Sequence, residues 1–542
     1  MFARVKKSGK YQYLQIVESR RNGRKVNQHV VATVGRLDKL QAKGEVENLI
    51  RSLSKYSEKA LMILSGKSDV TAQSKKIGPV LIFERLWKEL GIKKTINNLL
   101  LQRRFEFDVE RAIFLAVLHR LFVSGSDRSC DKWHRDYLVE GVEEISLHHM
   151  YRSMGFLGEI IDDQEDATEI SPRCTKDLIE EGIFFEHRDL FTELDLVFFD
   201  TTSIYFEGAG GETLGKHGHS KDHRPDLRQM VVGVVIDNGG RPICCELWPG
   251  NTADVKTLIP IADRIQKRFS ISRFCIVADR GMISNNTMQQ LEDPARDLLY
   301  ILGARLRKVN EIKNDVLSRA GRYKEVVPEG TKVKDPEPLQ VKEVQVGDNR
   351  YVVCLNPRQS RKDEADRQAI IDSLEERIKS GPKALVGNKG YKKYLKFSKS
   401  SVTIDRDKIA AKARFDGKWV LKTNTDLPAD QVALKYKELW QVEHLFRDLK
   451  SIMETRPIFH KQDETIRGHV FCSFLALVLR KELQRRLEIA GHKFEWNDIK
   501  QDLKSLQETT IEEKGQNISV RSQCVGCRRS ADDSRAVVFF RF

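Results

Sequence analysis

The sequence has no hydrophobic run long enough to cross a membrane. Its longest apolar stretch, residues 470–479, is about half of the roughly 18 residues that a bilayer span requires, and Arg467 and Arg480 flank it. The N-terminal residues MFARVKKSGK also lack the apolar segment of a secretory signal. We therefore expect a cytoplasmic protein that makes no contact with a membrane.

Cysteines are few and scattered, which excludes a disulfide framework. There are nine of them, an odd number. Cys524 and Cys527 form one C-x2-C pair, but the second pair or the histidines that a structural zinc site usually needs are not nearby. His217, His219 and His223 match no zinc spacing either. We expect no zinc at these positions, and the role of the two cysteines stays open.

Charge is abundant and unbalanced. Charged residues make up 32% of the 542 residues, and the formal net charge is +15. An excess of this size favours a polyanionic partner such as nucleic acid, although a soluble protein with a basic surface would have the same composition. The hydrophobic content of 40% is enough for substantial cores, and the length predicts several domains.

The chain begins with two regions of different character. YQYLQIVESR and KVNQHVVATVG alternate apolar and polar residues around the turn Arg21-Asn22-Gly23, which predicts a small, basic β unit. PVLIFERLWKELGI and VERAIFLAVLHRLF then repeat apolar residues every three or four positions, which is typical of helices. Asp108 is placed to cap the second of these helices.

The central part of the chain predicts an α/β domain. Three apolar runs are followed by a helix, a strand, a second helix and a fifth strand, an order that favours a mixed sheet. A β-like and highly charged segment then interrupts this order, before the strand KWVLKTN and a long helix from about residue 428 to 451. The predicted parts are a β unit with its linker (1–70), a helical DNA-binding region (71–190), a first core part (191–302), an inserted β-rich domain (303–418), a second core part (419–490) and a C-terminal region (491–542).

Two acids stand at the ends of buried-looking strands. Asp200 follows LVFF, and Asp279 follows CIVA. A carboxylate at a strand end is held rigidly and reaches solvent, as a ligand of Mg²⁺ must. The alternative is that each aspartate only begins a turn, which is common for this residue.

A third acid lies on the late helix. Leu439, Val442, Phe446, Leu449 and Met453 are spaced to form its buried stripe. The neighbouring stripe consists of Tyr436, Trp440, Glu443, Arg447 and Lys450. A helix packed on the sheet could therefore bring Glu443 near both aspartates, and the two basic residues could hold DNA phosphates. The alternative is an ordinary i,i+4 ion pair between Glu443 and Arg447 on a solvated face.

These three acids resemble the catalytic residues of DDE transposases with a ribonuclease-H-like core. The segments concerned are FFDTTS, VADRGM and YKELWQVEHLFRDLK. The last is similar to the Tyr-x2-Arg-x3-Glu-x6-Lys signature of the insertion-sequence-four group, which Tyr436, Glu443 and Lys450 match, while Leu439 stands at the arginine position. GHSKDHRPDLRQ and PGNTAD resemble the long-chain branch of that group. The resemblance covers about residues 190–480, and the long gap before Glu443 fits a family with an inserted, mostly β domain.

The resemblance implies a function and a set of partners. It implies two Mg²⁺ or Mn²⁺ ions held by Asp200, Asp279 and Glu443. It also implies cleavage of double-stranded DNA at terminal inverted repeats, strand transfer into target DNA, a dimer in the synaptic complex and a place at the bacterial nucleoid. The residues expected to contact DNA are Tyr436, Trp440, Arg447, Lys450, Lys221, Arg224 and Arg228. Trp440 could stack on a displaced base, or it could be a core or interface residue.

Two alternatives remain open from the sequence. One is a host nuclease of the same fold that cuts without joining. The other is a catalytically inactive DNA-binding derivative, although all three acids are retained. Both would keep the basic charge and the fold while lacking strand transfer.

Overall fold

The structure is a computed structural model. It describes residues 2–22, 25–54, 70–123, 125–168, 170–186, 196–271, 273–306, 309–327, 337–379, 394–397, 402–452, 455–513 and 516–522. The C-x2-C pair and Met453 lie outside these residues. Contacts divide the chain into two units, Met1–Gln73 with Thr510–Val520 and Ser74–Thr509 with Arg521–Phe542.

The first unit contains the predicted small β unit. Strands β1 (Phe2–Ser8), β2 (Tyr11–Asn22) and β3 (Lys25–Arg36) form an antiparallel sheet in the order β1-β2-β3. The pairing of β2 with β3 reaches Asn22 and Lys25, which confirms the predicted hairpin. Helices α1 (Leu37–Ala42) and α2 (Glu45–Ser54) follow.

The second unit begins with the predicted helical region. Its helices are α3 (Gly78–Glu89), α4 (Ile92–Leu100), α5 (Val109–Phe122), α6 (Asp127–Trp133), α7 (Leu147–Gly158) and α8 (Thr175–Glu186). The α5 helix is buried along its whole length, and the Asp108 carboxylate accepts the Arg111 backbone N–H at 3.0 Å as its N-cap, as predicted. The predicted helix and its N-cap are therefore confirmed.

The C-terminal helices close around this helical region. They are α16 (Asp463–Ile489) and α17 (Trp496–Ser505), and α16 packs on α5 and α7. Glycines permit the close approach, because a Cβ on Gly468 would overlap the Met154 backbone oxygen, and a Cβ on Gly158 would overlap that of Glu464. Strands β4 (Val70–Lys76), β16 (Gln507–Glu513) and β17 (Gln516–Arg521) form a separate sheet in the order β17-β16-β4.

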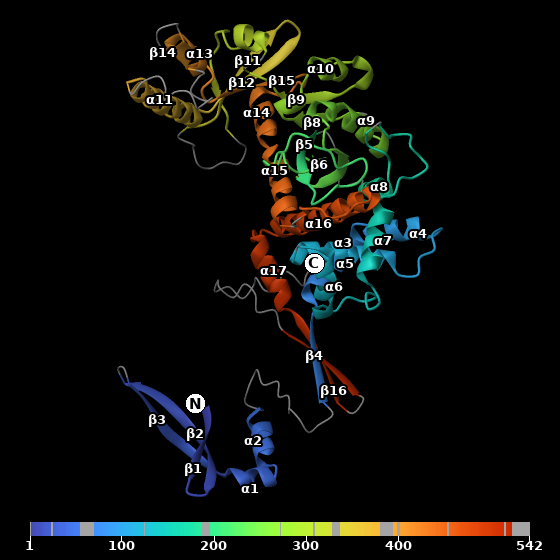
Figure 1. The fold of residues 1–542 in the computed structure, drawn as a ribbon, viewed down its shortest axis with the longest axis vertical. Coiled ribbons are helices and arrows are strands. Elements are labelled where there is room, and N and C mark those ends of the chain that lie inside the picture. Colours follow the sequence, from blue (N-terminus) through green and yellow to red (C-terminus); the bar gives the residue numbers. More distant parts are fainter. Residues whose placement is uncertain are drawn as a thin grey trace. The chain divides into compact units, whose positions relative to one another are not determined.

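A mixed sheet forms the centre of the second unit (Figure 1). Its strands are β5 (Leu196–Tyr205), β6 (Gln229–Asp237), β7 (Pro242–Pro249), β8 (Cys275–Ala278), β9 (Leu299–Gly303), β10 (Lys324–Glu325), β11 (Gln340–Val346), β12 (Asn349–Leu355) and β15 (Lys418–Thr423). The described strands follow the order β10-β11-β12-β15-β9-β8-β5-β6-β7. Because β5, β6 and β7 are antiparallel while β5, β8 and β9 are parallel, the predicted ribonuclease-H-like core is confirmed.

Helices cover both faces of this sheet. One face packs on α9 (Leu258–Phe269) and α10 (Asn285–Leu291), and the other packs on α14 (Ala429–Lys437), α15 (Trp440–Arg447) and α16 (Figure 1). The strands are apolar on both sides, and β6 is buried throughout. Continuous apolar runs such as MVVGVVI are what a sheet covered on both faces requires.

The predicted insertion is joined to the sheet. Its strands β10, β11 and β12 pair in sequence and reach β15, so they extend the central sheet. The remaining described elements of this segment, α11 (Pro357–Lys379), β13 (Leu395–Phe397), β14 (Val402–Ile404) and α13 (Arg406–Ala413), surround a small cluster around Leu374. The boundaries 303–418 stay a prediction, while the pairing shows that part of the segment belongs to the core sheet.

The prediction of one long helix from residue 428 to 451 is wrong. The chain forms α14, then α15, then a π-helical turn, η8 (Asp448–Ile452). Between the first two, the backbone tightens, because Leu439 N donates to Tyr436 O at 3.2 Å and Gln441 N donates to Glu438 O at 2.9 Å. Among the described helices, none is long and apolar enough to span a membrane.

Candidate catalytic site

Strand alternation places the two aspartates on one face of the sheet. Along β5, Val197 and Phe199 contact the α9 side, whereas Phe198 belongs to the core on the α14–α15 side. Asp200 is two residues beyond Phe198 and therefore points toward α14 and α15. The same alternation along β8 puts Asp279, which follows Ala278, on that face as well, because Val277 belongs to the same core as Phe198.

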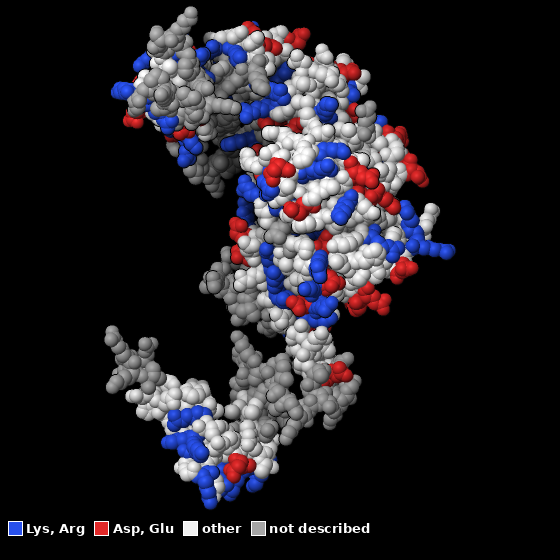
Figure 2. Space-filling view, viewed as in Figure 1, with Lys and Arg blue, Asp and Glu red and all other residues white. Residues whose placement is uncertain are grey.

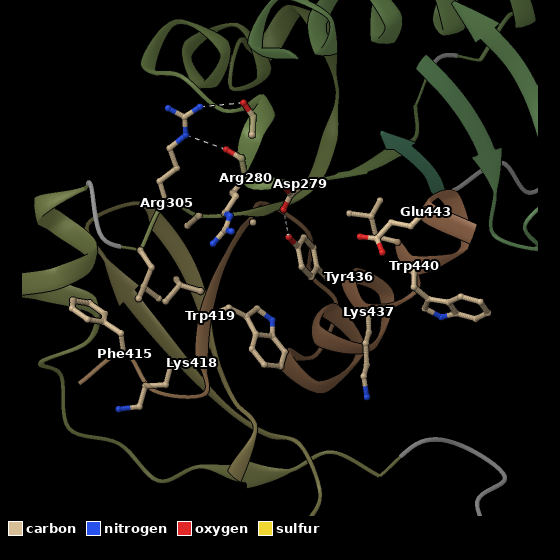
Figure 3. Close-up of a pocket in the computed structure, with 16 residues that line it drawn as sticks. Asp279, Arg280, Arg305, Phe415, Lys418, Trp419, Tyr436, Lys437, Trp440 and Glu443 are labelled. Carbon is tan, nitrogen blue, oxygen red and sulfur yellow. Dashed lines mark hydrogen bonds between the residues drawn. The ribbon is translucent and has the colours of Figure 1, made fainter. Parts of the chain in front are cut away.

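The third acid reaches this face from α15. Leu439, Val442, Phe446 and Leu449 are buried, as the predicted stripe requires. Glu443 is exposed beside that stripe, and together with Asp279 and Tyr436 it lines a cavity of about 890 Å³. Figure 3 shows its carboxylate directed toward Tyr436 and Asp279. Within the described part of the chain, Glu443 and Arg447 form no ion pair with each other.

The surroundings of Asp200 disfavour the ionised form of its carboxyl group. Burial, and to a smaller extent the neighbouring Asp279 and Asp254 carboxylates, raise the pKa of its carboxyl to about 6. The Lys221 ammonium and the Thr201 N–H, which donates to Asp200 Oδ1 at 2.7 Å, oppose that rise. A site in which several carboxylates repel one another is chemically suited to a divalent cation.

A fourth carboxylate, Asp254, belongs to this site. It begins the 3-10 turn η3 (Asp254–Lys256), and its Oδ1 accepts the Thr201 hydroxyl at 2.8 Å. Its Oδ2 lies 3.2 Å from Lys221 Nζ. A Cβ on Gly281 would lie 3.8 Å from Asp254 Oδ2 and 3.9 Å from Asp279 Oδ2, so both acids flank Gly281. Asp254 was not predicted from the sequence, although it is the last residue of the PGNTAD segment.

Tyr436 holds Asp279 in place. Its hydroxyl donates to Asp279 Oδ1 at 3.0 Å, and burial together with the adjacent carboxylate raises the pKa of the phenol. The ring approaches the backbone of Gly303 so closely that a Cβ there would overlap the tyrosine oxygen. Tyr436 therefore contacts one of the three predicted metal ligands, and its own contact with DNA stays a prediction.

The three acids are not gathered as tightly as the ligands of a bound ion would be. Among the described residues, the one group of three acidic, histidine or cysteine ligand atoms within 4.8 Å of one another is Asp127, His460 and His469. Arg120 Nη2 donates to Asp127 Oδ1 at 3.0 Å and lies 3.0 Å from His469 Nδ1. A guanidinium already supplies the positive charge there, so that cluster is a buried structural network.

The predicted DNA-binding residues fall into two sets. Trp440 is 54% exposed beside Glu443, and Arg447 is exposed one turn further along α15. Lys450 lies on the π-helical turn and donates to Asp222 Oδ1 at 2.8 Å, with its side chain only 11% exposed. The prediction that Lys450 contacts DNA from the same stripe as Glu443 stays a prediction, and the structure adds that Lys450 is paired with Asp222.

The basic residues before β6 are also engaged. Lys221 Nζ donates to Thr201 O at 2.7 Å, within the acidic site. Arg224 pairs with Asp226 at 2.8 Å, and Arg228 Nη1 donates to Ala209 O at 3.3 Å. The three histidines of this loop, His217, His219 and His223, are exposed and form no metal-ligand cluster among the described residues.

The acids lie on two adjacent strands of a ribonuclease-H-like sheet and on a helix that covers it. This arrangement is typical of enzymes that transfer phosphoryl groups. Residues 192–479 match the family model described as "Transposase DDE domain". The match spans more than half of the chain, and the protein belongs to the DDE transposase family. It is thus a DNA-cleaving transposase, of a family that uses divalent metal ions and acts on DNA.

The other comparisons refine this assignment. Residues 3–67 match "IS1634 family transposase, N-terminal domain". This is not the insertion-sequence-four type that the Tyr436–Glu443–Lys450 spacing resembles, so the prediction is supported at the level of DDE transposases only. No curated protein sequence matches the chain. A cryo-EM structure of a piggyBac transposase synaptic complex with hairpin DNA has 12% identity over 79% of each chain, with a TM-score of 0.35.

Proposed function

We propose that Asp200, Asp279 and Glu443 are the catalytic metal ligands of this transposase, and that Mg²⁺ or Mn²⁺, two ions per site, is the metal. The supporting observation is that the two aspartates point toward the helix carrying Glu443, while Asp279 and Glu443 line one cavity (Figure 3). The raised pKa of Asp200 supports the same assignment, because a bound cation would remove the repulsion that opposes its ionisation.

The chain's own residues would prepare the site for DNA. The Tyr436 hydroxyl fixes the Asp279 carboxylate, and Lys221 offsets part of the negative charge around Asp200 and Asp254. When bound, the metal would activate water or a 3′-hydroxyl and stabilise the leaving oxygen. Trp440, exposed at the edge of the cavity, would stack on a base near the cut phosphate.

The DNA substrate follows from the family. We propose cleavage at the terminal inverted repeats of the element and strand transfer into target DNA, with a dimer in the synaptic complex. The basic N-terminal β unit and the helices of residues 71–190 would read the ends, and Arg224, Arg228 and Arg447 would contact phosphates. Such a protein would act in the bacterial nucleoid.

An assay with labelled element ends tests the assignment. The wild type should nick the ends in Mg²⁺ and join them to a target duplex. Asp200→Asn and Glu443→Gln should bind the ends but not cut them. Glu438→Gln is a matched control, because Glu438 lies on the preceding turn of the same segment and outside the cavity. Equal cutting by Glu443→Gln and Glu438→Gln would refute the metal-ligand assignment.

The same assay separates the alternative functions. A host nuclease would cut the ends without joining them, and an inactive derivative would bind without cutting. Joining by the wild type would exclude both.

A further inference from the structure

A second cavity, of about 560 Å³, lies beside the catalytic helix in the same unit. Residues of α15, η8, α16 and α17 line it. The charged side chains in its wall are Arg447, Arg480, Lys481 and Lys500, against Asp448 and Glu495. Figure 1 places α17 next to α16, and Figure 2 shows Lys and Arg side chains lying among acidic ones on the visible face of this unit. The wall therefore carries more positive than negative charge.

Arg480 supplies a fixed charge at the back of this cavity. The residue is 6% exposed, its guanidinium lies 4.8 Å from the ring of Trp496, and its Nη1 is 3.2 Å from Asp448 Oδ2. Its Nε has no hydrogen-bond partner among the described residues. Burial lowers the pKa of this guanidinium despite the neighbouring carboxylate, so the surroundings compensate its charge incompletely.

Two lysines line the same cavity as Arg480. Lys481 and Lys500 are each half-buried, and within the described part of the chain neither forms an ion pair. Burial lowers the pKa of both ammonium groups, and the nearby Arg480 charge lowers it further. At Lys481 the Asp448 and Glu488 carboxylates offset part of this decrease. An ammonium group that has lost water without forming an ion pair is stabilised by an incoming anion.

The second cavity lies next to the catalytic cavity along α15, so the anion that it would meet is a phosphate of DNA. Trp440 and Glu443 line the catalytic cavity, whereas His444 and Arg447, on the following part of α15, line the second one. Glu443 and Arg447 are about 6 Å apart along the helix axis. Since each nucleotide of a DNA strand advances about 3.4 Å, a strand held at the acids would bring another phosphate to this cavity within a few nucleotides.

We propose that this cavity binds one backbone phosphate of DNA, close to the phosphate that is cut, through Lys481 and Lys500. The proposal rests on the proposed function only for the distance to the cut phosphate; binding of the strand itself can be tested without cleavage. Arg480 adds a buried positive charge to the wall of the cavity, and Arg447 is an exposed lining residue. Because binding to a phosphate carries no sequence information, the site fixes the position of the strand and does not select its bases.

The test is the salt dependence of binding to a mixed-sequence DNA duplex, measured with the full chain. In Lys481→Gln/Lys500→Gln, the plot of log Kd against log salt should become less steep by about 0.9 for each phosphate that the protein no longer neutralises. Lys493→Gln is the matched control, because Lys493 is an exposed lysine between α16 and α17 that does not line the cavity. Its slope should stay closer to that of the wild type.

Equal slopes for the double variant and Lys493→Gln would overturn the proposal. If the double variant fails to fold, the single variant Lys500→Gln decides: a slope reduced relative to Lys493→Gln supports the site, and an equal slope overturns it. A failure of the catalytic assignment would give a different result. The wild type would then bind the duplex with a steep dependence of log Kd on log salt but would not cut element ends. Cutting by the wild type, with no difference between the lysine variants, would refute the phosphate site alone.

Discussion

Replacing Asp200 by asparagine should stabilise the metal-free protein while abolishing cleavage. Burial and the neighbouring carboxylates raise the pKa of Asp200 from 3.8 to about 6. Each unit is worth about 1.36 kcal/mol, so the ionised side chain costs the folded protein about 3 kcal/mol above pH 6. An asparagine has no charge to bury, and its Oδ1 can still accept the Thr201 N–H.

The gain should depend on pH in one direction. A folded pKa above the unfolded one means that the wild-type Asp200 contributes stability below its ordinary value of 3.8, and that this contribution is lost as the pH rises through 6. Asp200→Asn should therefore have the larger free energy of unfolding at about pH 8, and the difference should shrink toward zero near pH 4. Urea titrations with a chelator present measure this difference at both pH values.

Two comparisons make the result decisive. Asp426→Asn changes an exposed aspartate before α14 and should leave stability unchanged at both pH values. Added Mn²⁺ should stabilise the wild type but not Asp200→Asn, since binding to the folded state alone raises stability. A variant that is less stable than the wild type at high pH without metal would refute the reasoning.

Further predictions concern two residues next to the acids. Tyr436→Phe removes a hydrogen bond to the Asp279 carboxylate worth about 1.5–3 kcal/mol, and should slow single-turnover cleavage about 10- to 100-fold. Gly303→Ala should cause a similar loss by displacing the tyrosine, and wild-type rates in both variants would contradict this role. Lys450→Ala should lower the free energy of unfolding by up to about 3 kcal/mol, because the buried Asp222 carboxylate loses one of its two cationic partners and keeps only Arg456. Unchanged stability with weaker DNA binding would instead show that Lys450 binds DNA.

Much of the core could be predicted because it depends on simple patterns. The apolar runs and the order of strands and helices predicted the central sheet, which the structure confirms. The positions of Asp200 and Asp279 relative to those runs also determine the face on which they lie, because side chains alternate along a strand. The buried stripe of α15 followed from its spacing of apolar residues, and Leu439, Val442, Phe446 and Leu449 are buried.

The structure differs from the predictions where hydrogen bonds and strand pairing depend on distant parts of the chain. No glycine or proline marks the tightened backbone between Lys437 and Trp440 or the π-helical turn after Arg447, so the sequence predicts one continuous helix. The turn then carries Lys450 to Asp222, far away in the sequence. KEVQVGDNRYVVCL predicts strands, but only packing decides that they extend the central sheet. Asp254 was missed because it lies on a short 3-10 turn and not at a strand end.

Iron-directed cleavage of the protein tests most directly whether the three acids share a metal. Fe²⁺ in place of Mg²⁺, with ascorbate and hydrogen peroxide, generates radicals that cut the backbone next to the bound ion. With DNA present, the predicted cuts lie near Asp200, Asp279 and Glu443, and Asp200→Asn should lose all three. Cuts near the two aspartates with none near Glu443 would contradict the account.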